Sequence, residues 1–69
     1  MNYSEHSYTL VSTGLGKNID KVFSSRESAN KKMYKLIGKN HLTVNEIYDD
    51  NHDKTYKCSN NVTFFVQRF

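Results

Sequence analysis

The residues of this sequence best suited to acid–base or nucleophilic chemistry are three histidines and one cysteine: His6, His41, His52 and Cys58. A nucleophile and its base must lie within hydrogen-bond reach, and no two of these residues have a spacing that would bring them together on one helix or strand. His52 has aspartates nearby, but one histidine among carboxylates in a loop is a weak site for a transition metal. We therefore expect a protein that is not an enzyme and holds no cofactor.

The aspartate-rich segment 49–53 partly matches a calcium-binding loop. Asp49, Asn51 and Asp53 occupy the first three ligand positions, at which oxygens two residues apart converge on one cation. Lys54 stands where that loop needs glycine, and Asn60 stands where a bidentate glutamate should close the site. We expect a solvated turn and no metal site, although the segment could offer negative charge to a basic partner surface.

Four lysines are the first candidate for a binding surface: Lys31, Lys32, Lys35 and Lys39. On a helix they fall within an arc of roughly 100°, on the side away from the apolar residues, and no acidic residue interrupts them. Such a stripe can contact nucleic-acid phosphates or an acidic protein. It can also be the solvated face that any amphipathic helix needs, and the net charge of +3 does not decide between these interpretations.

Aromatic residues near the C-terminus are the second candidate: Tyr56, Phe64, Phe65 and Phe69, with Arg68 among them. Rings on an open sheet face, beside an arginine, can stack unpaired bases. A small domain must use most of its rings in its core, however, and the glycine-bracketed aromatic signature of RNA-binding sheets is missing. We therefore assign these residues to partner binding without assigning the kind of partner.

The elements that position these residues follow from the apolar pattern. Strands are predicted at 8–13, 19–23, 42–48, 55–58 and 62–66, with turns at 14–18, 49–53 and 59–61. The glycines at 14 and 16 and the asparagines of the last turn tolerate positive φ. In the third strand Val44 and Ile47 fall on opposite faces, so we expect a bulge or an edge position there.

A helix is predicted between the second and third strands. Ser24 can cap the backbone at Glu27, whose side chain reaches back to complete a capping box. An apolar stripe of Ala29, Met33, Leu36 and Ile37 should face the sheet. Gly38 suits the left-handed position that ends a helix, which places the end at about residues 37–40.

The order ββαβββ predicts one α+β domain over residues 1–69, with an antiparallel sheet of four to five strands and one helix on one face. The other sheet face has no helix to cover it. Because Phe64 and Phe65 point to opposite faces, at least one ring should lie on the uncovered side as a partner or dimer contact. A free strand edge could also accept a partner strand or join two copies.

Size and cysteine content suggest how such a domain is stabilised and where it works. Domains this small usually add a disulfide, a metal or a partner subunit, and Cys58 has no second cysteine to bridge, so self-association into a homodimer is expected. We find no secretory-type N-terminal segment and no apolar run of about 18 residues. The sequence therefore predicts a soluble cytoplasmic protein with no membrane contact.

The segments 22–32 (VFSSRESANKK) and 46–50 (EIYDD), with the closing aromatic hairpin, resemble small accessory proteins of bacteriophages and prophages over roughly residues 8–68. Such proteins often bind and disable host defence machinery, as anti-CRISPR proteins do. The resemblance implies a phage-encoded, non-enzymatic inhibitor or modulator of a host protein in the host cytoplasm, and it carries over no functional residue. The alternative is a nucleic-acid-binding module that uses the lysine stripe.

Overall fold

The computed structural model describes residues 7–50 and 52–68, so the candidate residues His6, Asn51 and Phe69 lie outside the described part. The elements follow the predicted order: β1 Tyr8–Thr13, β2 Asp20–Phe23, α1 Arg26–Lys39, β3 Val44–Asp49, β4 Asp53–Cys58, a short 3-10 turn Ser59–Asn61, and β5 Thr63–Arg68. The strands form one antiparallel sheet in the order β2-β1-β5-β4-β3. The protein is thus an α+β fold, as predicted.

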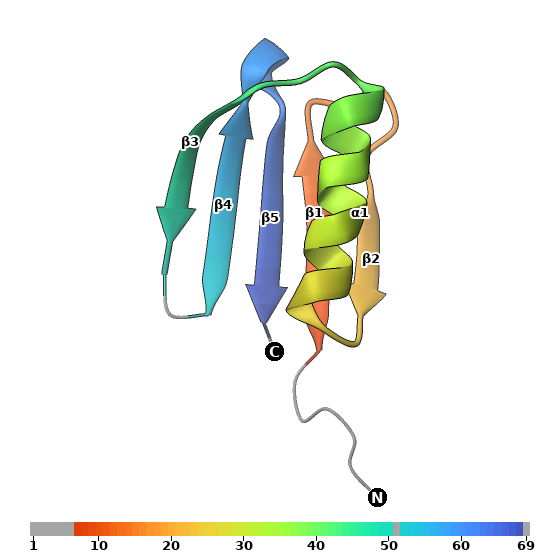
Figure 1. The fold of residues 1–69 in the computed structure, drawn as a ribbon, viewed down its shortest axis with the longest axis vertical. Helices are drawn as coiled ribbons and strands as arrows, with labels where there is room; N and C mark the ends of the chain where they lie inside the picture. The colour runs from red at the N-terminus through yellow and green to blue at the C-terminus, as the bar shows by residue number, and fades with distance from the viewer. Residues whose placement is uncertain (1–6, 51, 69) are drawn as a thin grey trace, which may run out of the picture.

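Helix α1 covers only one part of the sheet. It packs mainly on β1, β2 and β5, and its Tyr34 ring meets the Tyr56 ring of β4 edge-on, with the centroids 6.5 Å apart. Strand β3 lies beyond the helix (Figure 1). No other described element lies on the opposite sheet face. The structure therefore has two layers on the β2 side of the sheet and a single layer at the β3 edge.

The N-terminus of α1 differs from the prediction by one residue. Ser25, and not Ser24, is the N-cap: its extended backbone (φ −145°, ψ 155°) lets its hydroxyl oxygen accept from the Ser28 N–H at 3.1 Å. The third helical position is consequently Ser28, so Glu27 forms no capping box with Ser24. The predicted capping box was wrong because two adjacent serines offer the same chemistry at different registers.

Helix α1 ends at Lys39, with Asn40 as C-cap, which confirms the predicted end at residues 37–40, but the predicted role of Gly38 was wrong. Gly38 lies inside the helix, and the left-handed residue is His41, with φ of 55°. The N–H groups of His41 and Leu42 donate to the carbonyls of Gly38 (3.2 Å) and Ile37 (2.9 Å), which is the Schellman pattern of a helix end. Leu42 then packs against the core, and this contact places the left-handed residue at His41 and not at Gly38.

The two predicted hairpins, β1–β2 and β4–β5, form, and their turns pack together. Asn60 and Asn61 take φ values of 60° and 61° between β4 and β5, which confirms the positive-φ asparagines. Between β1 and β2, Gly14 has φ of 88°. A Cβ at Gly14 would stand 2.3 Å from the Asn61 carbonyl oxygen, so the first turn needs glycine for both its backbone angle and this close approach.

The β3–β4 connection is tighter than the predicted loop. Asp49 still belongs to β3 and Asp53 already belongs to β4, so the predicted loop over 49–53 was too long. The pairing register shifts between Val44 and Glu46, and this irregularity puts Val44 opposite Cys58 and Ile47 opposite Tyr56 on the same side. The bulge expected from the broken apolar alternation is confirmed, as is the edge position of β3.

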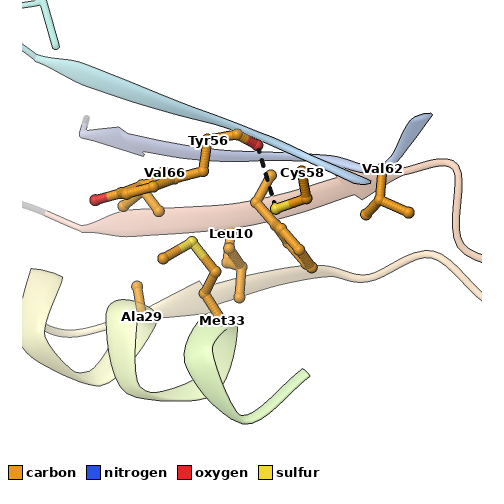
Figure 2. Close-up of a cluster of buried hydrophobic side chains, with 8 residues drawn as sticks. Leu10, Ala29, Met33, Tyr56, Cys58, Val62 and Val66 are labelled. Atoms are coloured by element: carbon orange, nitrogen blue, oxygen red, sulfur yellow. Dashed lines mark hydrogen bonds between the residues drawn. The ribbon is translucent and has the colours of Figure 1, made fainter. Parts of the chain in front are cut away.

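The core lies between α1 and the sheet. Its buried members are Leu10, Ala29, Met33, Tyr56, Cys58, Val62, Phe64 and Val66. Figure 2 shows Ala29 and Met33 reaching from the helix toward Leu10 and Val66 of the sheet. The predicted apolar stripe does face the sheet, although Leu36 and Ile37 are only half-buried at its margin.

Candidate binding surfaces

The predicted aromatic set is divided between the core and the surface. Phe64 is fully buried and Tyr56 is 4% exposed, both on the helix side of the sheet. The interpretation of these two rings as an open aromatic face was wrong, because the pleat turns them inward with Val66. Phe65 has the opposite orientation and is the half-buried ring predicted on the face without a helix.

Arg68 does not lie beside Phe65. Its cross-strand partner in β1 is Tyr8, and it lies on the same side of β5 as Phe64 and Val66. Its guanidinium contacts the Nδ1 atom of His52. The combination of an exposed ring and an adjacent arginine, which would favour base stacking, is therefore not formed by Phe65 and Arg68. Both remain predicted contact residues, but on different faces.

The uncovered sheet face carries a continuous row of side chains across four strands. The cross-strand partners Val11, Phe65, Thr55 and Tyr48 stand in register from β1 to β3. Tyr48 is 51% exposed, its ring lies 5.5 Å from the ammonium of Lys57, and its hydroxyl donates to the Glu46 carboxylate. This hydrogen bond, with the negative charge of Glu46, raises the pKa of the Tyr48 phenol above its ordinary value.

The outer edge of β3 carries two large apolar side chains that are exposed. Five of its six residues are exposed, including Ile47 at 57% on the helix side and Tyr48 on the uncovered side. No described strand pairs with its outer edge. Sequence reasoning anticipated an edge here but did not select Ile47 or Tyr48, because alternation alone does not show which strand lies outermost.

The free backbone groups of β3 can be assigned from the pairing pattern. The Asp50 N–H donates to the Asp53 carbonyl at 2.8 Å and closes the β3–β4 hairpin. Bonded and non-bonded pairs alternate along an antiparallel ladder, so Tyr48 bonds to β4 while Ile47 and Asp49 do not. The N–H and C=O groups of Ile47 and Asp49 therefore point outward from the sheet.

The charge of the β3 side is predominantly negative. Four of the chain's seven acidic residues, Glu46, Asp49, Asp50 and Asp53, lie between residues 46 and 53. Asp49 is offset by Lys54, whose ammonium is 3.7 Å from its carboxylate, and Lys57 stands beside Tyr48. With Arg68, whose guanidinium contacts His52, three cations stand against four carboxylates, so this side keeps a net negative charge away from the lysine-bearing helix.

All four lysines of the predicted stripe lie on α1, and the fold adds a fifth. Lys31, Lys35 and Lys39 are exposed and Lys32 is half-buried. Lys17, from the turn between β1 and β2, joins Lys39 at the rim of a hollow of about 220 Å³. We call these five residues the lysine face; none of them forms an ion pair with another described residue. Lys17 could not be identified from spacing along the helix, because it lies in the turn between β1 and β2.

The candidate nucleophile and bases occupy separate environments. His41 is exposed at the end of α1, and His52 is exposed beside the β3–β4 turn. Cys58 is buried in the core, where desolvation raises the pKa of its thiol, and its Sγ lies 3.9 Å from the Tyr56 carbonyl oxygen (Figure 2). Among residues 7–50 and 52–68 no group of three His, Cys, Asp or Glu side chains could hold a metal ion.

Comparison with known proteins finds no matching family, no curated relative and no similar solved structure. Within the described residues, no helix has the length and apolar character required to span a bilayer. The geometry of the β3 edge and of the lysine face therefore provides the basis for a functional proposal.

Proposed function

We propose that this protein is a non-enzymatic binding protein that accepts an extended segment of another protein along the outer edge of β3. The observation that carries the proposal is the pair of outward-facing backbone units at Ile47 and Asp49, flanked by two exposed apolar side chains. A partner strand would gain main-chain hydrogen bonds from the edge and specificity from side chains on its two sides.

The chemistry of the edge favours a basic segment as the partner. Glu46 and Asp49 lie on opposite faces of β3, so lysine or arginine on either face of an added strand would meet a carboxylate. Pairing two copies of β3 would instead bring like charges together, which is destabilising. The proposal therefore prefers a foreign strand to a homodimer at this edge.

The biological setting remains a prediction based on the resemblance to phage accessory proteins. An inhibitor that occupies a strand-binding surface needs no catalytic group, and this is compatible with the separated positions of His41, His52 and Cys58. A host protein, such as a component of a defence system, is the partner that the resemblance implies. The edge geometry defines how such a partner would be held.

A proline substitution tests strand addition without disturbing the sheet. Ile47→Pro removes an N–H that points outward, so the ladder to β4 stays intact and the fold should survive. Val22→Pro is the matched control, because Ser12 bonds to Ile19 and the same alternation turns the Val22 N–H outward at the β2 edge. Ile47→Ala separates the loss of the side chain from the loss of the backbone donor.

The measurement is affinity capture from bacterial lysate with mass spectrometry. Any captured protein is then titrated against the unsubstituted protein and against each of the three variants. We expect Ile47→Pro to weaken binding at least about tenfold, since a hydrogen bond contributes about 1 kcal/mol and the ring also blocks approach of the strand. Val22→Pro should bind as the unsubstituted chain does. A partner that binds Ile47→Pro and Val22→Pro equally well would refute strand addition at β3, and capture of no partner from any of several hosts would count against the proposal.

A further inference from the structure

We infer that the lysine face is a second binding site, for single-stranded nucleic acid, and that the hollow beside it receives one unstacked base. This inference is independent of the β3 edge. It rests on three observations: the spacing of the lysines, the absence of neutralising partners among the described residues, and the composition of the hollow.

The lysines form a track and not a cluster. Lys31, Lys35 and Lys39 are each four residues apart, so they follow one line of the helix at intervals of about 6 Å. Lys17 continues the track from the end of the helix onto the β1–β2 turn. Glu27 lies one turn before Lys31 on the same line, but no acidic residue occurs from 28 to 45, so the positive charge from Lys31 to Lys39 is uninterrupted.

The hollow at the end of this track is lined by both apolar and basic residues. Leu15 and Leu36 line it together with Lys17, Lys39 and Asn40. Its volume of about 220 Å³ is smaller than the roughly 300 Å³ lower bound of typical small-molecule pockets, but it suits one flat ring or side chain. Because bases inside a duplex are stacked and paired, only an unpaired base could enter, and this selects a single strand.

Charge complementarity selects the polyanion. Lysine ammonium groups on flexible stems act as adaptable point charges, which suits phosphates whose positions vary along a flexible strand. The acidic β3 side of a second copy could also meet these lysines. The regular track and the apolar hollow favour a nucleic-acid strand over a second copy. Self-association through the lysine face would be a result against the inference.

The experiment is a fluorescence anisotropy titration of a labelled 12-nucleotide oligothymidine and of a 12-base-pair duplex, between 25 and 200 mM NaCl. If all five lysines meet phosphates, log affinity should fall with log salt at a slope of about −3.5, or about a hundredfold between 50 and 200 mM. The duplex should bind more weakly than the single strand at every salt concentration.

Two matched double variants locate the site. Lys35→Ala with Lys39→Ala should reduce the slope by about 1.4, whereas Lys54→Ala with Lys57→Ala removes the same charge elsewhere and should leave it unchanged. Leu15→Ser should weaken oligothymidine binding about three- to tenfold with the slope unaltered. Ile47→Pro should bind the oligonucleotide normally, so failure at one site is distinguishable from failure at the other.

Three results would overturn the inference. Absence of salt-sensitive binding at 25 mM NaCl would remove the site, and equal or tighter binding of the duplex would exclude a single strand as its ligand. Low-salt self-association in analytical ultracentrifugation, lost in the Lys35→Ala, Lys39→Ala variant while the oligonucleotide does not bind, would assign the lysine face to a second copy.

Discussion

The sharpest structural prediction concerns Gly14, where the two hairpin turns meet. Its φ of 88° lies in the region that side chains rarely adopt, and a Cβ there would stand 2.3 Å from the Asn61 carbonyl oxygen and 3.0 Å from the Val62 Cα. Both contacts involve backbone, so no side-chain rotation can relieve them. Gly14→Ala must therefore either move the β1–β2 turn or displace the β4–β5 turn.

The expected cost follows from these two effects. A non-glycine residue at positive φ costs about 1–2 kcal/mol. Separating the turns adds a comparable amount because Val62, only 3% exposed, would lose part of its packing. A total of about 2–4 kcal/mol is a large share of the roughly 3–10 kcal/mol expected for a domain of 69 residues.

Urea unfolding followed by circular dichroism measures this cost, with Gly16→Ala as the control. Nothing lies within 4 Å of a Cβ at Gly16 and its φ is outside the positive region, so Gly16→Ala should stay within about 1 kcal/mol of the unsubstituted chain. Gly14→Ala should lower the thermal midpoint by about 10–25 °C. Equal stability of the two variants would show that the turns do not meet as described.

Two further predictions concern the helix end and the buried thiol. Gly38→Ala should raise the free energy of unfolding by about 0.5–1 kcal/mol in the same urea assay, because Gly38 lies in the helix and an added Cβ would have nothing within 4 Å. A loss of stability would instead place the left-handed helix end at Gly38. Cys58 should react with a thiol-specific disulfide reagent at pH 8 at least about 100-fold more slowly in the native protein than in urea, because burial both raises its pKa and blocks access. Because the thiol of the unfolded chain deprotonates at a lower pH than the buried thiol, the stability gained by burying neutral Cys58 is complete below about pH 8 and is lost as pH rises further. Rapid reaction of the native protein would contradict burial of Cys58.

The features predictable from sequence were those decided by local chemistry. Asparagine tolerates positive φ, so Asn60 and Asn61 identify their turn without knowledge of the rest of the chain. The broken apolar alternation between Val44 and Ile47 requires a bulge if both are to face the same side, and the bulge is present. The element order also gave the fold class, because one amphipathic helix can cover only one side of a sheet.

The errors arose where local chemistry allows two answers and packing chooses between them. Ser24 and Ser25 cap equally well, and Gly38 can end a helix, but Leu42 reaches the core only if His41 takes the left-handed position. For the rings, a strand pattern fixes that Phe64 and Phe65 face opposite sides without fixing which side is covered. Phe64 faces inward because it is the cross-strand partner of Tyr56, on the face of the sheet that the helix covers.

The two proposed surfaces lie at opposite ends of one sheet, and this separation has a functional consequence. Helix α1 contacts β1, β2 and β5, whereas β3 stands at the far edge with acidic side chains (Figure 1). A basic protein segment at β3 and a nucleic-acid strand on the lysine face would each meet a region of opposite charge, and neither would occupy the other's site. A small domain could in this way hold a protein next to a nucleic acid, or keep the two from meeting. Binding of one ligand in the presence of the other would distinguish these roles: affinity that is unchanged or raised indicates a bridge, and mutual exclusion indicates competition.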